Sequence, residues 1–238
     1  MLNAKHDMLR GSPIMLCLAA AASLGLAAAA AAGTVRGQIQ ITGNPPRTDS
    51  APAETGITRT NQPPLRDFVV FLESETGTNF PPPRTPVTIQ VRRDANNNSV
   101  FSPHVLPVLV GTTVEWRNED TVYHKLFSLS EVAMFEFPLS REGDDPHRWT
   151  FAKPGRADVF CSIYANMSGT VLVLENPWFT GTDYRNNYLI PKVPAGNYRL
   201  KVWHERLPIQ TREITVPEQG EVRVDFILNS PNPAAPAK

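Results

Sequence analysis

Residues 157–169 read Ala-Asp-Val-Phe-Cys-Ser-Ile-Tyr-Ala-Asn-Met-Ser-Gly, and this stretch decides what fold and what chemistry the chain is expected to have. It supplies a thiol at Cys161 and a thioether at Met167, six residues later. An imidazole, His124, lies 37 residues upstream of the thiol. Thiolate, imidazole and a weak axial thioether are the ligand types of copper electron-transfer sites. The stretch therefore predicts a metal site, from which one expected ligand, a second histidine, is missing.

The composition favours short strands joined by turns. The 238 residues include 23 prolines and 14 glycines, and no long amphipathic pattern follows the N-terminal region. Lysine and arginine together number 23, as do aspartate and glutamate. A nucleic-acid-binding surface needs a basic excess, so we expect no nucleic-acid partner.

Residues 1–32 have the pattern of a secretory signal peptide. Lys5 and Arg10 precede an apolar, alanine-rich run that ends in small residues near Ala32. A membrane anchor is the alternative, because the run is about long enough to span a bilayer. No stop-transfer flank follows it, so we expect cleavage, a periplasmic or otherwise extracytoplasmic protein, and no membrane span in the mature chain.

Cleavage near Ala32 removes Cys17 and leaves Cys161 as the only cysteine. Exported proteins usually pair their cysteines. An unpaired one therefore indicates a reactive thiol, an intermolecular bridge or a ligand. The alternative is a buried, inert thiol that acts as a small apolar side chain.

Alternating apolar residues predict strands along most of the chain. Two strands, over residues 34–41 and 67–73, precede a central group that ends with residues 169–175. Residues 125–148 are expected to be a long connection with weak strand signals around residues 134–139. A last group over residues 176–228, which ends in one strand at residues 222–228, has the spacing of a small antiparallel sandwich. Residues 229–238 are expected to be a disordered tail.

Several short motifs follow one another through residues 101–169: Phe101-Ser102-Pro103, Val110-Gly111-Thr112-Thr113-Val114, Trp116-Arg117-Asn118-Glu119-Asp120 before His124, Pro154-Gly155, and Val159-Phe160-Cys161-Ser162 before Met167-Ser168-Gly169. In this order they make residues 84–175 resemble a cupredoxin of the plastocyanin and amicyanin type. They are also similar to plastocyanin-like proteins named in connection with methylamine utilisation, whose last part resembles residues 176–204. The resemblance implies a Greek-key β-sandwich that binds copper.

The resemblance also implies which residues hold the metal. His124, Cys161 and Met167 match the ligand positions, and Asn118 matches the position that braces the ligand loop by a hydrogen bond. Tyr164 stands where the family has its exposed histidine. Three interpretations remain open: copper bound by the other three ligands with water or a neighbouring side chain, Tyr164 itself as a ligand, or an empty site on a retained fold.

The remaining histidines have structural interpretations. His104, at a strand start, is expected to be structural or exposed, although it is a candidate for the missing imidazole if the fold brings it close. His147 sits in the acidic stretch that begins at Glu142, which is expected to be a solvated loop. His204, with Glu205, is expected to make a structural hydrogen bond.

The C-terminal strands resemble the latter part of a carboxypeptidase-regulatory-like, transthyretin-type sandwich. Such domains begin with two strands like those at residues 34–41 and 68–72, which here precede the cupredoxin-like part. We therefore expect residues 33–76 to complete the sandwich of residues 176–228, with the cupredoxin-like residues inserted between them.

The sequence thus predicts an exported, two-domain, all-β electron carrier with a copper cofactor. The resemblance implies a redox partner such as a c-type cytochrome or a dehydrogenase. A metal-free binding or scaffold module is the alternative. A copper or iron enzyme that uses an open coordination position is a third hypothesis, but no nucleophile–base pair or other catalytic residue is evident in the sequence.

Overall fold

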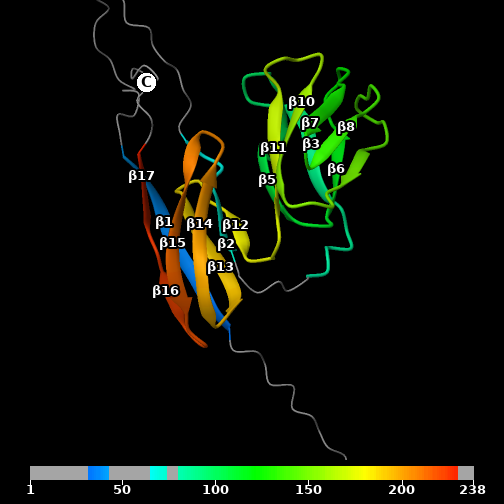
Figure 1. Cartoon of the computed structure of the whole chain (residues 1–238). Helices are drawn as coiled ribbons and strands as arrows, with labels where there is room; N and C mark the ends of the chain where they lie inside the picture. The colour runs from blue at the N-terminus through cyan, green and yellow to red at the C-terminus, as the bar shows by residue number, and fades with distance from the viewer. Residues whose placement is uncertain (1–31, 43–64, 74–79, 230–238) are drawn as a thin grey trace, which may run out of the picture. The chain divides into compact units, whose positions relative to one another are not determined.

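The computed structural model describes residues 32–42, 65–73 and 80–229. Every regular element in these residues is a β-strand, which confirms the all-β class (Figure 1). Residues 1–31 of the expected signal peptide and residues 230–238 of the expected C-terminal tail lie outside the described residues. Within the described part, no helix is long and apolar enough to cross a membrane.

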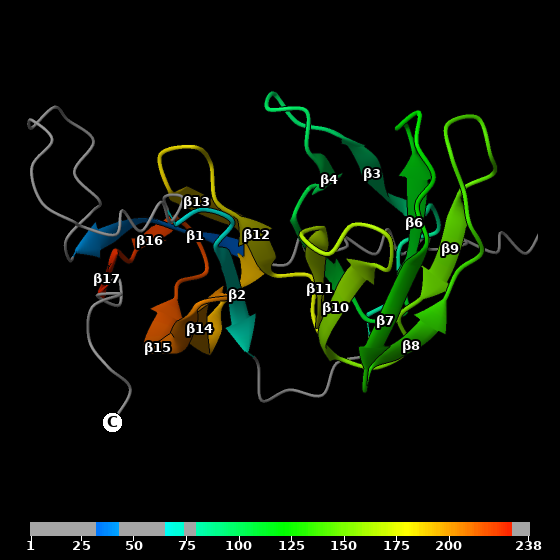
Figure 2. The ribbon, with the colours of Figure 1, turned by 90° about the horizontal axis from the view of Figure 1, so that it is seen from above.

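The strands of residues 87–174 form two sheets, one in the order β4-β3-β6-β9 (Figure 2) and the other in the order β5-β11-β10-β7-β8. The pairs β3–β6 and β5–β11 are parallel, and the other neighbours are antiparallel. The strands are β3 (Val87–Arg93), β4 (Ser99–Ser102), β5 (Val105–Leu109), β6 (Thr113–Asn118), β7 (Leu126–Ser130), β8 (Ala133–Glu136), β9 (His147–Thr150), β10 (Gly155–Cys161) and β11 (Ser168–Leu174).

The period of two along β10 places Cys161 on the core side of its sheet. Ala157, Val159 and Cys161 are buried, whereas Phe160 between them is exposed. Successive side chains of a strand point to opposite faces, so the apolar partners of Cys161 on its own strand fix the direction of its thiol. The same apolar core contains Trp116 and Met167.

The two N-terminal strands lie in the sheets of the C-terminal strands. One sheet is built around β1, which pairs with β13, β16 and β17, and the other has the order β12-β2-β14-β15. This is the pairing that the sequence predicted for the strands before the cupredoxin-like part. The strands are β1 (Ala32–Thr42), β2 (Val69–Glu73), β12 (Phe179–Gly181), β13 (Asn187–Pro194), β14 (Gly196–His204), β15 (Leu207–Val216), β16 (Glu221–Arg223) and β17 (Phe226–Asn229).

A second apolar core lies between these sheets and includes Val35, Phe68, Leu200 and Phe226. Burying an apolar side chain of this kind stabilises the fold by about 1.5–3 kcal/mol. Two of these four residues come from before the cupredoxin-like residues and two from after them. Chain segments far apart in the sequence therefore share one core.

The prediction of a long connection over residues 125–148 is wrong in part, because these residues form strand β7 as well as β8. Leu126 and Ser128 face the core from β7. Because Ser128 is a polar residue at a buried position, the apolar alternation is interrupted and the sequence pattern does not indicate a strand here.

The single strand expected at residues 222–228 is divided into β16 and β17. The break falls where Asp225 accepts a hydrogen bond from the backbone N–H of Gln38, at 2.8 Å. This side-chain bond replaces a ladder bond, so the two short strands pair with different parts of β1.

Candidate metal centre

Cys161 and His124 meet in the interior of the two sheets formed by residues 87–174. The Sγ atom of Cys161 lies 3.6 Å from Nδ1 of His124. The thiol residue is 4% exposed and the imidazole residue 1% exposed. Two strong metal-ligand atoms, 37 residues apart in the chain, are thus brought together and shielded from water.

The loop that follows β6 positions His124. The backbone N–H of His124 donates to the carbonyl oxygen of Ser140 at 2.9 Å, and the N–H of Ser140 donates back at 3.0 Å. These two bonds form an isolated bridge between antiparallel segments. The backbone of His124 is therefore held in place by the protein alone, without a metal.

Asp120 fixes the orientation of the imidazole. Its Oδ2 atom lies 3.2 Å from Nε2 of His124 and 2.7 Å from the hydroxyl oxygen of Ser99, and its Oδ1 atom accepts a bond from Arg93 at 3.1 Å. A carboxylate with these donors is an acceptor, so Nε2 carries the proton and the Nδ1 lone pair faces Cys161.

Burial and hydrogen bonding set the charges of this pair. Burial raises the pKa of Asp120, but the bonds donated by Ser99, His124, Val122 and Arg93 together hold that pKa below its usual value. Burial lowers the pKa of His124 and outweighs the attraction of the Asp120 carboxylate. The imidazole is therefore neutral at neutral pH, the form that binds metals.

Met167 closes the loop between β10 and β11. It is 2% exposed and lies in the same core as Cys161. Its carbonyl oxygen accepts a bond from the N–H of Cys161 at 3.2 Å, and its own N–H donates to the carbonyl oxygen of Tyr164 at 3.0 Å. The loop is thus a compact turn that presents the thioether from the same stretch as the thiol.

The donor set fits a metal ion. Metal–thiolate and metal–imidazole bonds, about 2.3 and 2.0 Å long for Zn²⁺, sum to more than the 3.6 Å between the two ligand atoms. Both atoms can therefore reach one ion without a change in the backbone. No group of three or more His, Cys, Asp or Glu residues in the described part of the chain is placed to hold a metal. A site here thus depends on the thioether and on one further ligand.

Tyr164 packs against the imidazole. It is half-buried, and its ring centroid lies 5.0 Å from that of His124 with the ring planes inclined at 45°. This is a tilted ring contact of the ordinary kind. The side chain at the position of the family's second histidine therefore packs against one of the candidate ligands.

Asn118 braces a different segment from the one that the resemblance implied. Its amide nitrogen donates to the carbonyl oxygen of Ser140 at 2.8 Å, and its side-chain oxygen accepts from the N–H of Asp120 at 2.8 Å. Both partners belong to the segments that hold His124. Asn118 therefore supports the imidazole side of the site, and its two bonds do not reach the loop of Cys161 and Met167.

The other histidines do not join the site. His104 lies between the carbonyl oxygen of Ser168 and the carboxylate of Glu205, at 3.0 Å from each. His147 is part of β9, where it stacks on Phe137 with ring centroids 4.8 Å apart, so its interpretation as part of a solvated loop is wrong. Neither His104 nor His147 therefore supplies the missing imidazole.

His204 has a structural role in the hairpin of β14 and β15. It is buried, its Nδ1 atom accepts a bond from the N–H of Arg206 at 3.0 Å, and its ring packs on Phe68 with centroids 4.7 Å apart.

Asp120 is the functional candidate that sequence reasoning missed. Its position four residues before His124 was visible, but an aspartate in a loop is most often solvated. The role of this one depends on Arg93 and Ser99, which come from β3 and β4.

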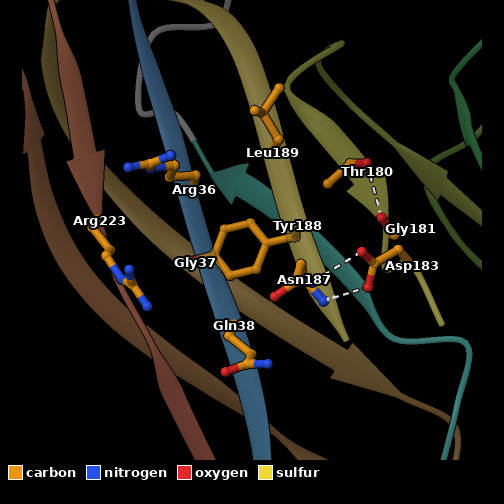
Figure 3. Close-up of a pocket in the computed structure, with 10 residues that line it drawn as sticks. All are labelled: Arg36, Gly37, Gln38, Thr180, Gly181, Asp183, Asn187, Tyr188, Leu189 and Arg223. Carbon is orange, nitrogen blue, oxygen red and sulfur yellow. Dashed lines mark hydrogen bonds between the residues drawn. The ribbon is translucent and has the colours of Figure 1, made fainter. Parts of the chain in front are cut away.

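A pocket of about 470 Å³ lies elsewhere, on the sheet of β1 and β13. Figure 3 shows its lining, in which the side chains of Asp183 and Asn187 bond to each other. Its arginines are paired as well, Arg36 with Glu221 and Arg223 with Asp225. These polar groups satisfy one another, and the pocket offers no cluster of metal ligands.

Comparison with known proteins gives structural neighbours only. No protein-family model matches the chain, and no curated protein matches it. Among solved structures, a purple cupredoxin from Nitrosopumilus maritimus is 28% identical, with a TM-score of 0.34 over 37% of this chain and 99% of that one. A reduced amicyanin variant is 19% identical, with a TM-score of 0.34 over 44% of this chain and 98% of the other.

A copper-containing nitrite reductase from Thermus scotoductus is 34% identical, with a TM-score of 0.34 over 39% of this chain. The match spans only 23% of the reductase.

Proposed function

We propose that this chain binds one copper ion at Cys161, His124 and Met167 and carries single electrons. The observation that supports this most strongly is the buried contact between the thiol sulfur and Nδ1 of His124, at 3.6 Å. Bound copper would supply the ability to exchange one electron between its two oxidation states. A thiolate favours Cu(I), an imidazole serves both states, and a weak axial thioether tunes the potential.

The protein contributes rigidity and orientation. The Nε2–H···Oδ2 bond to Asp120 and the backbone bridge to Ser140 hold the imidazole with Nδ1 toward the sulfur. Such outer partners raise the basicity of a ligating histidine and fix its tautomer. Ligands that do not move between oxidation states make electron exchange fast.

The second imidazole has no replacement of equal strength. Tyr164 occupies its place, and a neutral phenol is a weaker ligand for copper than an imidazole. We therefore propose that water or the Tyr164 side chain completes the coordination. Affinity for copper is then expected to be lower than that of a site with two imidazoles.

A metal-free role is the alternative, and the same contact favours it. The S–H group of Cys161 can donate to Nδ1 of His124 at 3.6 Å, so both groups have a partner without any ion. In that case the chain would be a binding or scaffold module that retains the fold.

The proposal also includes a redox partner and a location outside the cytoplasm. We propose export by the N-terminal signal and electron exchange with a c-type cytochrome or a dehydrogenase outside the cytoplasm. In this role the chain is a carrier and not an enzyme.

Comparison of the native protein with Tyr164→His separates these roles. Cu(II) is added to each purified protein, and the intense visible thiolate-to-copper absorption is measured. Absorption in both proteins supports the copper carrier. Absorption only in the variant supports the metal-free module, because the restored imidazole would then be what the native site lacks.

A further inference from the structure

Two sequence motifs that the metal centre does not use meet each other in the structure. Phe101-Ser102-Pro103-His104 ends β4 and leads into β5, and Trp203-His204-Glu205 ends β14. The Nε2 atom of His104 lies 3.0 Å from Oε2 of Glu205, although 101 residues separate them. The described strands belong to one compact unit. Val105, which follows His104, and Trp203, two residues before Glu205, belong to one apolar cluster.

The other face of the His104 ring contacts the segment that follows Met167. Its Nδ1 atom lies 3.0 Å from the carbonyl oxygen of Ser168. A carbonyl only accepts, so Nδ1 donates. Nε2, on the opposite side of the ring, lies within hydrogen-bonding distance of the Glu205 carboxyl group, at 3.0 Å. The ring is thus fixed at two opposite atoms.

The backbone of His104 holds the same segment. The N–H of Thr170 donates to the carbonyl oxygen of His104 at 2.9 Å. Between these two contacts lies Gly169, where an added Cβ would stand 3.1 Å from that carbonyl oxygen and 3.0 Å from the Phe101 ring. Residues 168–170 are therefore packed directly against the motif that carries His104.

We propose that His104, oriented by Glu205, is a positioning residue for the Met167 thioether. Met167 itself is held by backbone bonds to Cys161 and Tyr164, which come before it in the chain. Ser168, the residue after Met167, is held by His104. The chain of contacts from Glu205 through His104 to Ser168 sets how far the thioether stands from the thiol and the imidazole.

This inference rests on the proposed function only for the role of Met167 as a ligand. The anchoring of residues 168–170 is a property of the metal-free protein. An axial thioether tunes the reduction potential, so the β14–β15 turn would influence that potential although it lies outside the candidate site.

The test compares Glu205→Ala, His104→Ala and the double variant with a matched control, Glu221→Ala. The control removes an exposed ion pair with Arg36 in the sandwich that carries Glu205 and leaves His104 untouched. Circular dichroism verifies the fold of each variant. Because Glu205 is partly exposed, its variant is expected to fold even if His104→Ala does not.

The first measurement is hydrogen–deuterium exchange of metal-free protein. Loss of either partner should accelerate exchange of the Thr170 amide about tenfold. The double variant should match His104→Ala, because the two residues act through one contact, and Glu205→Gln should restore most of the protection. Unchanged exchange in Glu205→Ala, or equal acceleration in Glu221→Ala, would overturn the proposal.

The second measurement is the reduction potential of copper-loaded protein. Glu205→Ala and His104→Ala should shift it in the same direction, and Glu221→Ala should not. Faster exchange without a shift in potential would refute the link to Met167. Absence of copper binding in the native protein would instead refute the proposed function, and the exchange measurement would still decide whether His104 anchors the segment.

Discussion

Asp120 and His124 are joined by a buried hydrogen bond of 3.2 Å between Oδ2 and Nε2, with side chains that are 1% and 0% exposed. The carboxylate also accepts bonds from Arg93 and Ser99. The imidazole therefore has one nitrogen committed to the protein and the other directed at Cys161. This relationship makes the neighbourhood of the thiol a candidate metal centre.

Replacing Asp120 by alanine should weaken both the fold and the site. The change leaves the Nε–H group of Arg93 and the Nε2–H group of His124 without their acceptor, which should lower the free energy of unfolding by about 2–4 kcal/mol. Loss of an outer partner of a ligating histidine should reduce copper affinity about 10–100-fold. Denaturant unfolding and copper competition titrations measure the two effects. A variant with native affinity would contradict the role given to Asp120.

Met167→Leu separates a ligand from a core residue. The two side chains have similar volumes, so the free energy of unfolding should change by less than about 1.5 kcal/mol. Loss of the axial thioether should nevertheless shift the reduction potential of the copper-loaded protein. Voltammetry provides the comparison, and an unchanged potential would show that the sulfur does not act on the metal.

Stability should fall in mild acid because His204 is buried in its neutral form. Burial lowers the pKa of His204 below its reference value of 6.5, and the charge of Arg206 lowers it further. The unfolded chain then binds protons more readily than the folded one as pH falls below about 6.5, which favours unfolding. Stability is thus fully present above that pH and decreases toward the folded-state pKa.

Urea unfolding between pH 7 and pH 5 tests this expectation. His204→Asn retains an acceptor for the Arg206 N–H and removes the titration, so its stability should depend less on pH than that of the native protein. Burial also lowers the pKa of His124, so some pH dependence should remain in the metal-free variant. Identical slopes in both proteins would contradict the prediction.

Gly37→Ala should disrupt the sandwich of β1. A Cβ at this position would lie 1.8 Å from the carbonyl oxygen of Val224, a backbone atom that cannot move aside without loss of strand pairing. The cost should reach about 3 kcal/mol or more. Gly181→Ala is the control, because the nearest atom to its Cβ is 4.0 Å away. Thermal unfolding that shifts equally in both variants would count against the placement of β1.

Much of the fold could be predicted from local sequence. Alternation in β10 predicted that Cys161 belongs to a strand. The pairing of β1 and β2 with later strands was predicted from the resemblance of the C-terminal strands to a carboxypeptidase-regulatory-like sandwich, in which two such strands come first. Strand β7 was missed because Ser128 occupies a buried position, which apolar periodicity cannot reveal.

The partners of the site residues were harder to predict. Asp120 became part of the site only through Arg93 and Ser99, which lie 27 and 21 residues away. The contact of His104 with Glu205 spans 101 residues and leaves no local pattern. Asn118 was expected to brace the Cys161 loop, but its neighbour Asp120 and the facing Ser140 take both of its bonds. Spacing constrains ligands within one loop, whereas tertiary contacts determine the groups around them.

A Cu(II) titration of the native protein decides whether Cys161 and His124 hold one copper ion. We expect an intense visible thiolate-to-copper absorption that saturates near one ion per chain and is absent in Cys161→Ser. A native protein with a verified free thiol and no such absorption would contradict it.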